Sequence, residues 1–518
     1  MNSCCFLGFG RGFGGFSGAR ALKSVYSTTS RFLSGKSFKD IPGPRGYTVL
    51  NRLVKEIPLR HFCLPLGVSE LDALHLAGFE KYRRFGKIVR EAVLPGVNIV
   101  WLFDPDDIAT VLNDHGSGNF PERRSHLALE KYRNDRPSIY RTPGLLPTNG
   151  SAWWKLRAQV QKNLSSPQIV KQFLAAVDEI TREFLEKLDL DRAEEDFLPE
   201  LSRLNLEIIG FLAFDTRLNS FSDEERVPES RSSRLIEAAE ESNSCILPLD
   251  QNFPLFKLFE TPLYRRFRKA QEFLEEVALE MVESKAAALR SERSLIAEYL
   301  RNENLEIRDI VGMASDFFLA GIDTTSYTTS FLLYHLSNNP TVQEKLFQES
   351  LRVLPEEDSQ LSSAALQEIP FARAVLKESL RLNPVSVGVG RTLTTDTLLS
   401  GFLVPRGTII VTQNQISCRL PIHFHQPECF LPERWLKSTR TVAPHPHLVL
   451  PFGHGMRSCI ARRLAEQNML LLMLRMVRKY KLVWKGAPKL DFVTKLVNKP
   501  SSAIKIHLIQ RPRKLTAN

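Results

Sequence analysis

Cysteine is scarce in this sequence of 518 residues, and its arrangement excludes two classes of protein. The seven cysteines are an odd number and include no Cys-x-x-Cys pair, so neither a disulfide framework nor a cysteine zinc site is expected. This cysteine usage fits a reducing compartment. The cysteines are Cys4, Cys5, Cys63, Cys245, Cys418, Cys429 and Cys459.

Acidic residues are missing from the first 39 positions, which carry six basic residues. The same segment lacks the continuous apolar run that a secretory signal or an N-terminal membrane anchor needs. We therefore expect residues 1–39 to be a mitochondrial transit peptide, with a disordered basic tail as the alternative. Ile41-Pro42-Gly43-Pro44 follows as a rigid extended turn, which places the start of one folded domain, residues 40–518, at Asp40.

The remainder of the chain has no strong excess of one charge. The whole chain has 69 basic and 58 acidic residues and a formal charge of +11, which falls to +5 without the six basic residues of the first segment. So small and scattered an excess does not favour a nucleic-acid-binding protein. With 43% hydrophobic and 25% charged residues, the chain has the composition of a globular protein with a large core.

Apolar residues recur mostly at three- and four-residue spacings, which predicts long amphipathic helices over 152–187 and 230–300. A polar loop is expected between them, at 220–231. A helix over 307–336 would be about 45 Å long and would cross the domain. A shorter helix is expected over 371–382, and 390–412 alternates as short strands with turns. The sequence thus predicts a mainly α fold with a small β portion and a long central helix.

Three prolines interrupt the helical spacing between Cys245 and Tyr264, a segment that is also rich in apolar residues. The basic residues Arg265, Arg266, Arg268 and Lys269 follow it directly. An apolar segment followed by cations can rest on an anionic membrane surface. A loop that packs on the core is equally consistent with the pattern.

The richest motif is Pro451-Phe452-Gly453-His454-Gly455-Met456-Arg457-Ser458-Cys459-Ile460-Ala461, directly before the helical pattern 462–476. Its two glycines allow a tight turn and a close approach to a flat ligand. The turn delivers Cys459 to a helix start, where N–H donors and the positive helix end are expected to lower the thiol pKa. A thiolate placed in this way can ligate a haem iron and promote cleavage of an O–O bond.

This motif resembles the Cys-ligand loop of the cytochrome P-450 family, with Phe452, Gly455, Arg457 and Cys459 at the family's spacing. Matching motifs run in the family's order from Pro42 to Cys459. The resemblance implies the cytochrome P-450 fold, haem b with Cys459 as its iron ligand, and a monooxygenase that uses dioxygen. The motif departs from the family at Ala461, where most members have Gly, and we expect the added methyl group to be tolerated.

Ala320-Gly321-Ile322-Asp323-Thr324-Thr325 resembles the family's oxygen-binding stretch in the long helix. Gly321 would leave room for a diatomic molecule, and the Thr324 hydroxyl would bond to the carbonyl four residues earlier and open the helix locally. Asp323 and Thr324 would then relay protons. A polar stripe in a buried helix is the alternative reading.

Two further sets of residues match the family in supporting roles. Glu378 and Arg381 lie three apart on a helix and by themselves would be a surface ion pair. Together with Arg434 they resemble the family's buried charge triad, which holds the Cys loop. Arginines pair with carboxylates through two parallel bonds. The residues that resemble the family's haem-propionate contacts are Trp153, Arg157, Arg391 and Arg457.

The leader and a set of cations on the thiolate side resemble the mitochondrial subgroup, which takes electrons from an adrenodoxin-like ferredoxin with an NADPH-dependent reductase. A plain solvated face is the alternative for these cations. The Cys loop from Gly453 to Asn468 looks like that of the arthropod ecdysteroid 22-hydroxylases, which implies a sterol substrate. The expected docking residues are Arg373, Lys377, Arg462 and Arg463.

Such a sterol pocket is expected between the loop after Phe120, the segment Cys245–Tyr264 and the upstream part of the long helix. The location expected is the matrix side of the inner mitochondrial membrane, with peripheral contact. The nearest alternative is a mitochondrial hydroxylase of another sterol, a secosteroid or a xenobiotic. Two alternatives of another class are a haem-thiolate isomerase or dehydratase and a non-catalytic haem-binding protein.

Overall fold

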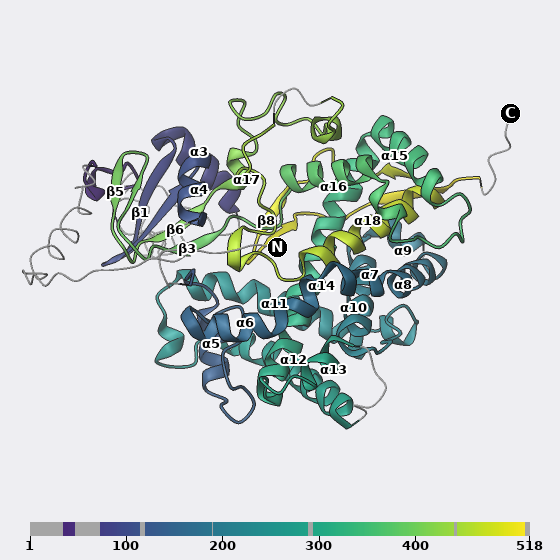
Figure 1. Cartoon of the computed structure of the whole chain (residues 1–518), viewed down its shortest axis with the longest axis horizontal. Helices are drawn as coiled ribbons and strands as arrows, with labels where there is room; N and C mark the ends of the chain where they lie inside the picture. The colour runs from purple at the N-terminus through teal and green to yellow at the C-terminus, as the bar shows by residue number, and fades with distance from the viewer. Residues whose placement is uncertain are drawn as a thin grey trace, which may run out of the picture.

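The computed structural model describes residues 35–46, 73–113, 120–188, 190–287, 294–439 and 443–512. Helices make up most of it and gather in one large body, with a smaller β-rich part at its side (Figure 1). The helices are α3 Leu74–Phe85, α4 Pro105–Asn113, α5 Leu127–Asn134, α6 Gly150–Ser165, α7 Pro167–Gln172, α8 Leu174–Glu186, α9 Leu190–Glu195, α10 Leu198–Phe214, α11 Arg231–Gln251, α12 Pro262–Ala287, α13 Leu295–Leu300, α14 Ile307–Asn338, α15 Pro340–Val353, α16 Pro370–Leu382, α17 Asn414–Ser417 and α18 Arg462–Lys479.

Helix α14 is the axis around which the helical body is arranged. Its 32 residues would span about 48 Å at about 1.5 Å per residue. The side chain of Glu306 accepts from the backbone of Asp309, whose own side chain accepts from the Glu306 N–H, so a capping box starts the helix. Helices α10, α11, α12 and α16 pack around it, and most of its residues are buried. The long central helix predicted from the sequence is confirmed.

The β-rich part contains a four-stranded sheet in the order β1-β2-β6-β3. Strand β6 runs parallel to β2 and antiparallel to β3, so residues 88–102 and residues 390–412 meet in one sheet. A core separate from that of the helical body, which includes Val100, Ile108 and Ile410, lies between this sheet and α4. The strands are β1 Ile88–Leu94, β2 Val97–Leu102, β3 Gly390–Thr392, β4 Thr397–Leu399, β5 Phe402–Val404, β6 Ile409–Thr412, β7 Tyr480–Trp484, β8 Phe492–Thr494, β9 Asn498–Pro500 and β10 Ile506–Gln510, and the last eight strands include the pairs β4–β5, β7–β10 and β8–β9.

The expected helix over 152–187 is three helices in the structure, since α6 ends at Ser165 and α7 ends before Phe173. Pro167 explains the first break, because proline biases the residue before it away from helix and is itself favoured at a helix start. At Pro248 the sequence predicts a break that is absent, because α11 continues to Gln251 with this proline inside its last turns. The expected irregular segment therefore begins only at Asn252.

The folded chain begins earlier than the boundary expected at Asp40. Lys36 forms a parallel bridge with Phe402, and its N–H donates to the carbonyl of Gly401 at 2.9 Å. Residues 38–40 form a short 3-10 helix against the same strands. Residues 35–39 therefore belong to the fold, while the rest of the expected leader, residues 1–34, lies outside the described residues. Among the described helices, none is both long and apolar enough to span a bilayer.

Candidate active site

The Cys loop is built as a tight turn that closes on itself just before α18. Gly453 and Gly455 have φ values of +71° and +70°, a region that side chains disfavour, so both positions require glycine. The Cys459 N–H donates to the Phe452 carbonyl at 2.8 Å, which closes the loop. Helix α18 then begins at Arg462, three residues after Cys459.

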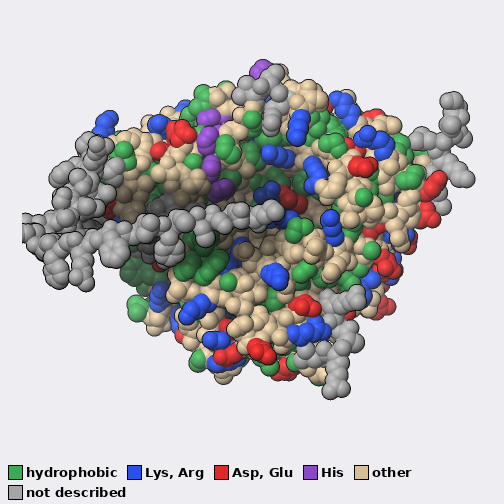
Figure 2. Space-filling model, in the orientation of Figure 1, with side chains coloured by type: hydrophobic (Ala, Val, Ile, Leu, Met, Phe, Trp, Pro, Cys, Tyr) green, Lys and Arg blue, Asp and Glu red, His purple; other side chains and the backbone are tan. Residues whose placement is uncertain are grey.

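The thiol of Cys459 has a raised pKa, which contradicts the lowering expected from the sequence. Burial is the largest cause, and it outweighs the hydrogen bond from the Ala461 N–H and the charges of Arg157 and Arg462, which favour the thiolate. The side chain is nevertheless accessible to solvent. Figure 2 shows that one face of the molecule is hollowed near its middle.

Ala461, the one departure from the family motif, occupies an ordinary backbone conformation. Its φ of −95° lies outside the region that favours glycine, and it serves as the N-cap residue of α18. Its N–H is the donor to the Cys459 sulfur. The backbone at this position therefore does not need glycine.

Four arginines from distant parts of the chain converge beside the loop without an acidic partner: Arg123, Arg157, Arg391 and Arg457. Within the described residues none of them forms an ion pair with a carboxylate, and their hydrogen bonds go to carbonyl and amide oxygens such as those of Ser458, His454 and Asn149. Burial and then mutual repulsion lower the pKa of Arg457 to about 9, and that of Arg391 to about 10. Arg123, whose pKa burial lowers to about 10, was missed in the sequence because no motif surrounds it.

The Trp153 ring is in contact with two of these arginines. The guanidinium carbons of Arg457 and Arg157 are 4.3 and 5.9 Å from its ring, and only 2% of the residue is exposed. Arg462 lies 5.5 Å from the ring of Phe452 in the Cys loop. Cation–π contacts thus hold aromatic and basic residues of α6 and the loop together.

One stripe of α14 is uncovered in the middle of an otherwise buried helix. Ala320 is exposed and Thr324 is half-buried, one turn apart. The Thr324 hydroxyl donates to the Ala320 carbonyl at 2.7 Å, as expected, but α14 is one uninterrupted α-helix, so the expected local opening is wrong. A Cβ at Gly321 would lie 2.7 Å from Cδ1 of Ile209 on α10, so glycine at this position also leaves room for the end of that side chain.

Asp323 points away from this stripe into a polar network between helices. It is 2% exposed, and the Asn243 side chain of α11 donates to it at 2.8 Å. Burial raises the pKa of Asp323 to about 7, against the lowering effect of Asn243. Glu240, one turn before Asn243, pairs with Lys499 of β9. The charges of this ion pair act on Asp323 in opposite directions, and the carboxyl can exchange protons near neutral pH.

A haem group fits these residues. The two propionates of haem would supply the carboxylates that the four arginines lack, and an accessible thiol stands next to them. Among the described residues, no group of three or more His, Cys, Asp or Glu side chains is arranged to hold a metal ion. The accessible thiol of Cys459 would be the protein ligand of a haem iron.

Glu378, Arg381 and Arg434 are in direct contact. Arg381 donates to both Glu378 oxygens at 2.8 and 2.9 Å, and Arg434 donates to one of them at 2.9 Å. Although burial opposes it, the Arg381 pair holds the pKa of Glu378 below its ordinary value. Arg381 also donates to the carbonyls of Cys418, Pro427 and Cys429, so the charges brace the segment that leads to the Cys loop.

The four expected docking cations are all exposed, two on α16 and two at the start of α18. Helices α16 and α18 are in contact, which places the pairs on neighbouring elements. Arg462 forms an ion pair with Glu466 at 3.0 Å, and the Lys377 ammonium lies 4.1 Å from the ring of Trp435. Arg373 donates to the Leu366 carbonyl.

The three segments expected to line a substrate pocket come together. Asp250 near the end of α11 accepts from the backbone N–H groups of His126 and Leu127, in the loop region after Phe120. Asn243 of α11 donates to the Leu319 carbonyl of α14 at 3.0 Å. Helix α11 therefore contacts the loop at one end and α14 at Asn243.

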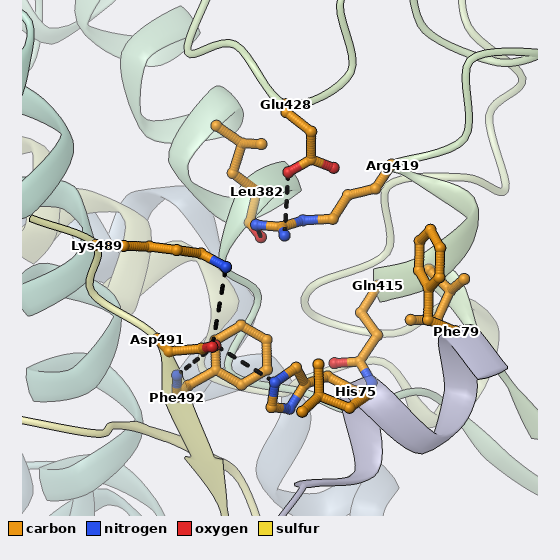
Figure 3. Close-up of a pocket in the computed structure, with 11 residues that line it drawn as sticks. His75, Phe79, Leu382, Gln415, Arg419, Glu428, Lys489, Asp491 and Phe492 are labelled. Carbon is orange, nitrogen blue, oxygen red and sulfur yellow. Dashed lines mark hydrogen bonds and ion pairs between the residues drawn. The ribbon is translucent and has the colours of Figure 1, made fainter.

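A separate cavity of about 100 Å³ lies between α3, α17 and the start of β8 (Figure 3). His75 and Lys489 point to Asp491, with distances of 3.3 and 3.9 Å, and Arg419 points to Glu428 at 3.3 Å. None of the predicted site residues lines this cavity. Its charges are paired with one another, so it is not a second candidate for the active site.

Comparisons with known proteins agree with this arrangement. The family model described as cytochrome P-450 matches residues 60–507. The chain is 49% identical over 491 residues, 94% of its length, to 98% of "cytochrome P-450 302a1, mitochondrial" of Drosophila melanogaster. It is 30% identical to "probable cytochrome P-450 49a1" of the same species, over 88% of this chain and 80% of that protein. The crystal structure of the cytochrome P-450DA haem domain superposes with a TM-score of 0.74 at 21% identity, covering 92% and 97% of the two chains, which shows the same fold.

Proposed function

The chain belongs to the cytochrome P-450 family, and we propose that it is a mitochondrial sterol hydroxylase fed by a ferredoxin. Membership makes it a haem-thiolate monooxygenase. The observation that carries the finer proposal is the 49% identity, over nearly the whole of both chains, to a fly protein named as mitochondrial. Together with the resemblance of the loop Gly453–Asn468 to ecdysteroid 22-hydroxylases, it supports hydroxylation of a sterol side chain at carbon 22 in moulting-hormone synthesis.

Haem, when bound, supplies the iron that activates dioxygen for insertion of one oxygen atom into a C–H bond. Cys459 would hold that iron, and Arg123, Arg157, Arg391 and Arg457 would pair with the propionates. Glu378, Arg381 and Arg434 do not reach the reacting atoms. They would keep the loop in place, because removing one partner leaves buried charges unpaired.

Protons would reach the reaction through α14. Asp323 is buried, titrates near neutral pH and touches Asn243, while the Thr324 hydroxyl faces the uncovered stripe of the same helix. Adjacent positions on a helix point about 100° apart, so Asp323 and Thr324 connect the inter-helix network to the stripe. Asp323 would exchange protons with the network, and Thr324 would position them at the substrate side.

Electrons would arrive at the exposed cations of α16 and α18. Arg373, Lys377, Arg462 and Arg463 stand on the side of the molecule from which α18 leads back to Cys459. An acidic ferredoxin would be steered to such a surface by charge.

A peripheral membrane contact would lie at the loop between α11 and α12. Four large apolar side chains are exposed there, with exposed fractions from 40% to 79%: Phe253, Leu255, Leu258 and Phe259. Clustered exposed apolar residues mark interaction sites. The nearby Arg265 and Arg268 are paired with Glu260, so the apolar contact, more than the charge, would hold the protein at the surface.

Purified enzyme incubated with a mitochondrial ferredoxin, its reductase, NADPH and a panel of sterols tests the proposal. We expect one sterol class to gain a single oxygen atom, derived from labelled dioxygen, in its side chain. Fragmentation that places the new hydroxyl on the ring system would contradict the carbon-22 assignment. Failure to oxidise any sterol under conditions where the reduced protein shows the thiolate-type carbon monoxide spectrum would contradict the sterol assignment.

A further inference from the structure

Trp435 lies against the exposed Lys377 of α16, and the proposed reaction gives this tryptophan no role. It ends a short 3-10 helix, Pro432–Trp435, that is in contact with α16. Its side chain is half-buried, so part of the indole is open to solvent. Aromatic side chains of this kind are enriched at protein interfaces, where an apolar body and one polar N–H are both useful.

Two neighbouring residues of α16 contact the indole, one at its N–H and one over its ring. The Trp435 Nε1–H donates to Oε2 of Glu378 at 2.8 Å, and the Lys377 ammonium lies 4.1 Å from the ring centroid. Glu378 is itself fully buried and bound by Arg381 and Arg434. The indole therefore has a fixed support at its N–H and carries an exposed cation over its ring.

The indole also packs against the segment that leads to the Cys loop. Trp435 contacts the buried cluster of Cys418, Phe424 and Leu448. Its ring centroid is 6.1 Å from that of Phe424. Leu448 comes three residues before Pro451, where the Cys loop motif starts. A hydrogen bond to a buried carboxylate and packing on a buried cluster leave the indole little freedom to move.

A cation of α18 is held on an aromatic ring in the same way. Arg462 lies 5.5 Å from the ring of Phe452 in the Cys loop and forms an ion pair with Glu466. A long basic side chain loses rotamer freedom when a binding partner fixes it. A ring that holds the cation beforehand reduces this loss, so the partner binds more tightly.

We propose that Trp435 is a positioning residue of the ferredoxin-binding surface, which holds the Lys377 ammonium in place for a carboxylate of the acidic partner. The ring covers one side of the ammonium, and the exposed side remains open to that carboxylate. The inference rests on the proposed ferredoxin docking and adds to it a residue without charge. Glu378 acts through Trp435 here, in addition to its contacts with the arginines.

The size of the expected effect follows from the strength of a cation–π contact. At an exposed site such a contact changes an equilibrium constant by about two- to fivefold. Trp435→Leu should therefore raise the Kd for ferredoxin by about two- to fivefold. It removes no charge, so the salt dependence of this Kd should stay that of the natural chain, whereas Lys377→Met should reduce the salt dependence.

Isothermal titration of the ferric holoprotein with oxidised mitochondrial ferredoxin, at several salt concentrations, tests the proposal. The natural chain, Trp435→Leu, Lys377→Met and the double variant form a double-mutant cycle. Because the indole acts through Lys377, Trp435→Leu should have no further effect on the Kd in the Lys377→Met background. Trp484→Leu is the matched control and should leave the Kd unchanged, since Trp484 in β7 is also half-buried and donates its N–H to the Ala487 carbonyl at 2.7 Å.

Two further variants separate the ring from its N–H. Trp435→Phe keeps a ring for Lys377 but loses the hydrogen bond to Glu378, and it should bind ferredoxin more tightly than Trp435→Leu. Trp435→Gln keeps an N–H donor but loses the ring, and its Kd should match that of Trp435→Leu. The thiolate-type carbon monoxide spectrum of each reduced variant reports whether the Cys loop is intact.

Two results would overturn the inference while ferredoxin still binds. One is an unchanged Kd in Trp435→Leu. The other is an equal rise of the Kd on Trp435→Leu in the natural and the Lys377→Met backgrounds, which would mean that the substitution acts through the fold and not through Lys377. A natural chain that binds no ferredoxin would overturn the ferredoxin proposal itself, and this inference with it.

Discussion

Replacing Asp323 with Asn should change the pH dependence of stability by an amount that follows from the structure. The carboxyl is 2% exposed, and burial raises its pKa from 3.8 to about 7. The unfolded chain releases this proton near pH 3.8, whereas the folded chain keeps it until about pH 7. Between these values the unfolded state binds fewer protons, so folding becomes less favourable as the pH rises, and above about pH 7 the loss is constant.

The difference between 3.8 and about 7 corresponds to about 4 kcal/mol at about 1.4 kcal/mol per pH unit. About 3 kcal/mol of this falls between about pH 5 and pH 8. Asn cannot ionise, and its amide fills nearly the same space beside Asn243. The stability of Asp323→Asn relative to the natural chain should therefore rise by up to about 3 kcal/mol across this range.

Urea unfolding of the ferric holoprotein at several pH values, followed by circular dichroism and by the haem absorbance, measures this difference. Glu303→Gln is the matched control for removal of a carboxylate, because Glu303 is exposed in the loop before α14. Parallel curves for Asp323→Asn and the natural chain would refute the reasoning. They would mean that the carboxyl is not held protonated by burial, and the proposed proton relay would lose its titrating group.

Four further changes have expected outcomes. Cys459→Ala should abolish turnover and the thiolate-type carbon monoxide spectrum. Cys429→Ala, at another exposed cysteine, should keep both. Oxygenation by Cys459→Ala would exclude Cys459 as the iron ligand. Arg462→Glu with Arg463→Glu should raise the apparent KM for ferredoxin and make this KM less sensitive to salt. Lys485→Glu, just after β7, should leave both unchanged. Unchanged kinetics in both variants would mean that the two arginines only face solvent. Glu378→Gln should lower the free energy of unfolding by about 3–5 kcal/mol, because it leaves two arginines without their partner. Glu433→Gln, which breaks an exposed pair with Lys345, should lower it by less than about 1 kcal/mol. Equal losses of the two variants in chemical denaturation would contradict a buried triad. Leu258→Ser with Phe259→Ser should weaken sedimentation with anionic vesicles severalfold, whereas Ile422→Ser, at an equally exposed apolar residue elsewhere, should not.

The sequence by itself determined the features whose residues are neighbours along the chain. The Cys loop was predictable because two glycines, Arg457 and Cys459 lie within seven residues and impose a turn whatever surrounds them. The long helix was predictable because a capping box and a helical apolar pattern act within a few turns. The family followed from the order of such local motifs, and the comparisons confirmed it.

Only the tertiary structure decided what depends on distant partners. The thiol pKa of Cys459 rises because burial outweighs a helix start, and burial is a property of the whole fold. The neighbour of Gly321 is Ile209 on another helix, and Arg123 joins the other arginines only when α6, β3 and the Cys loop come together. The meeting of Trp435 with Lys377 and Glu378 spans more than 50 positions of sequence, where spacing carries no information about contact.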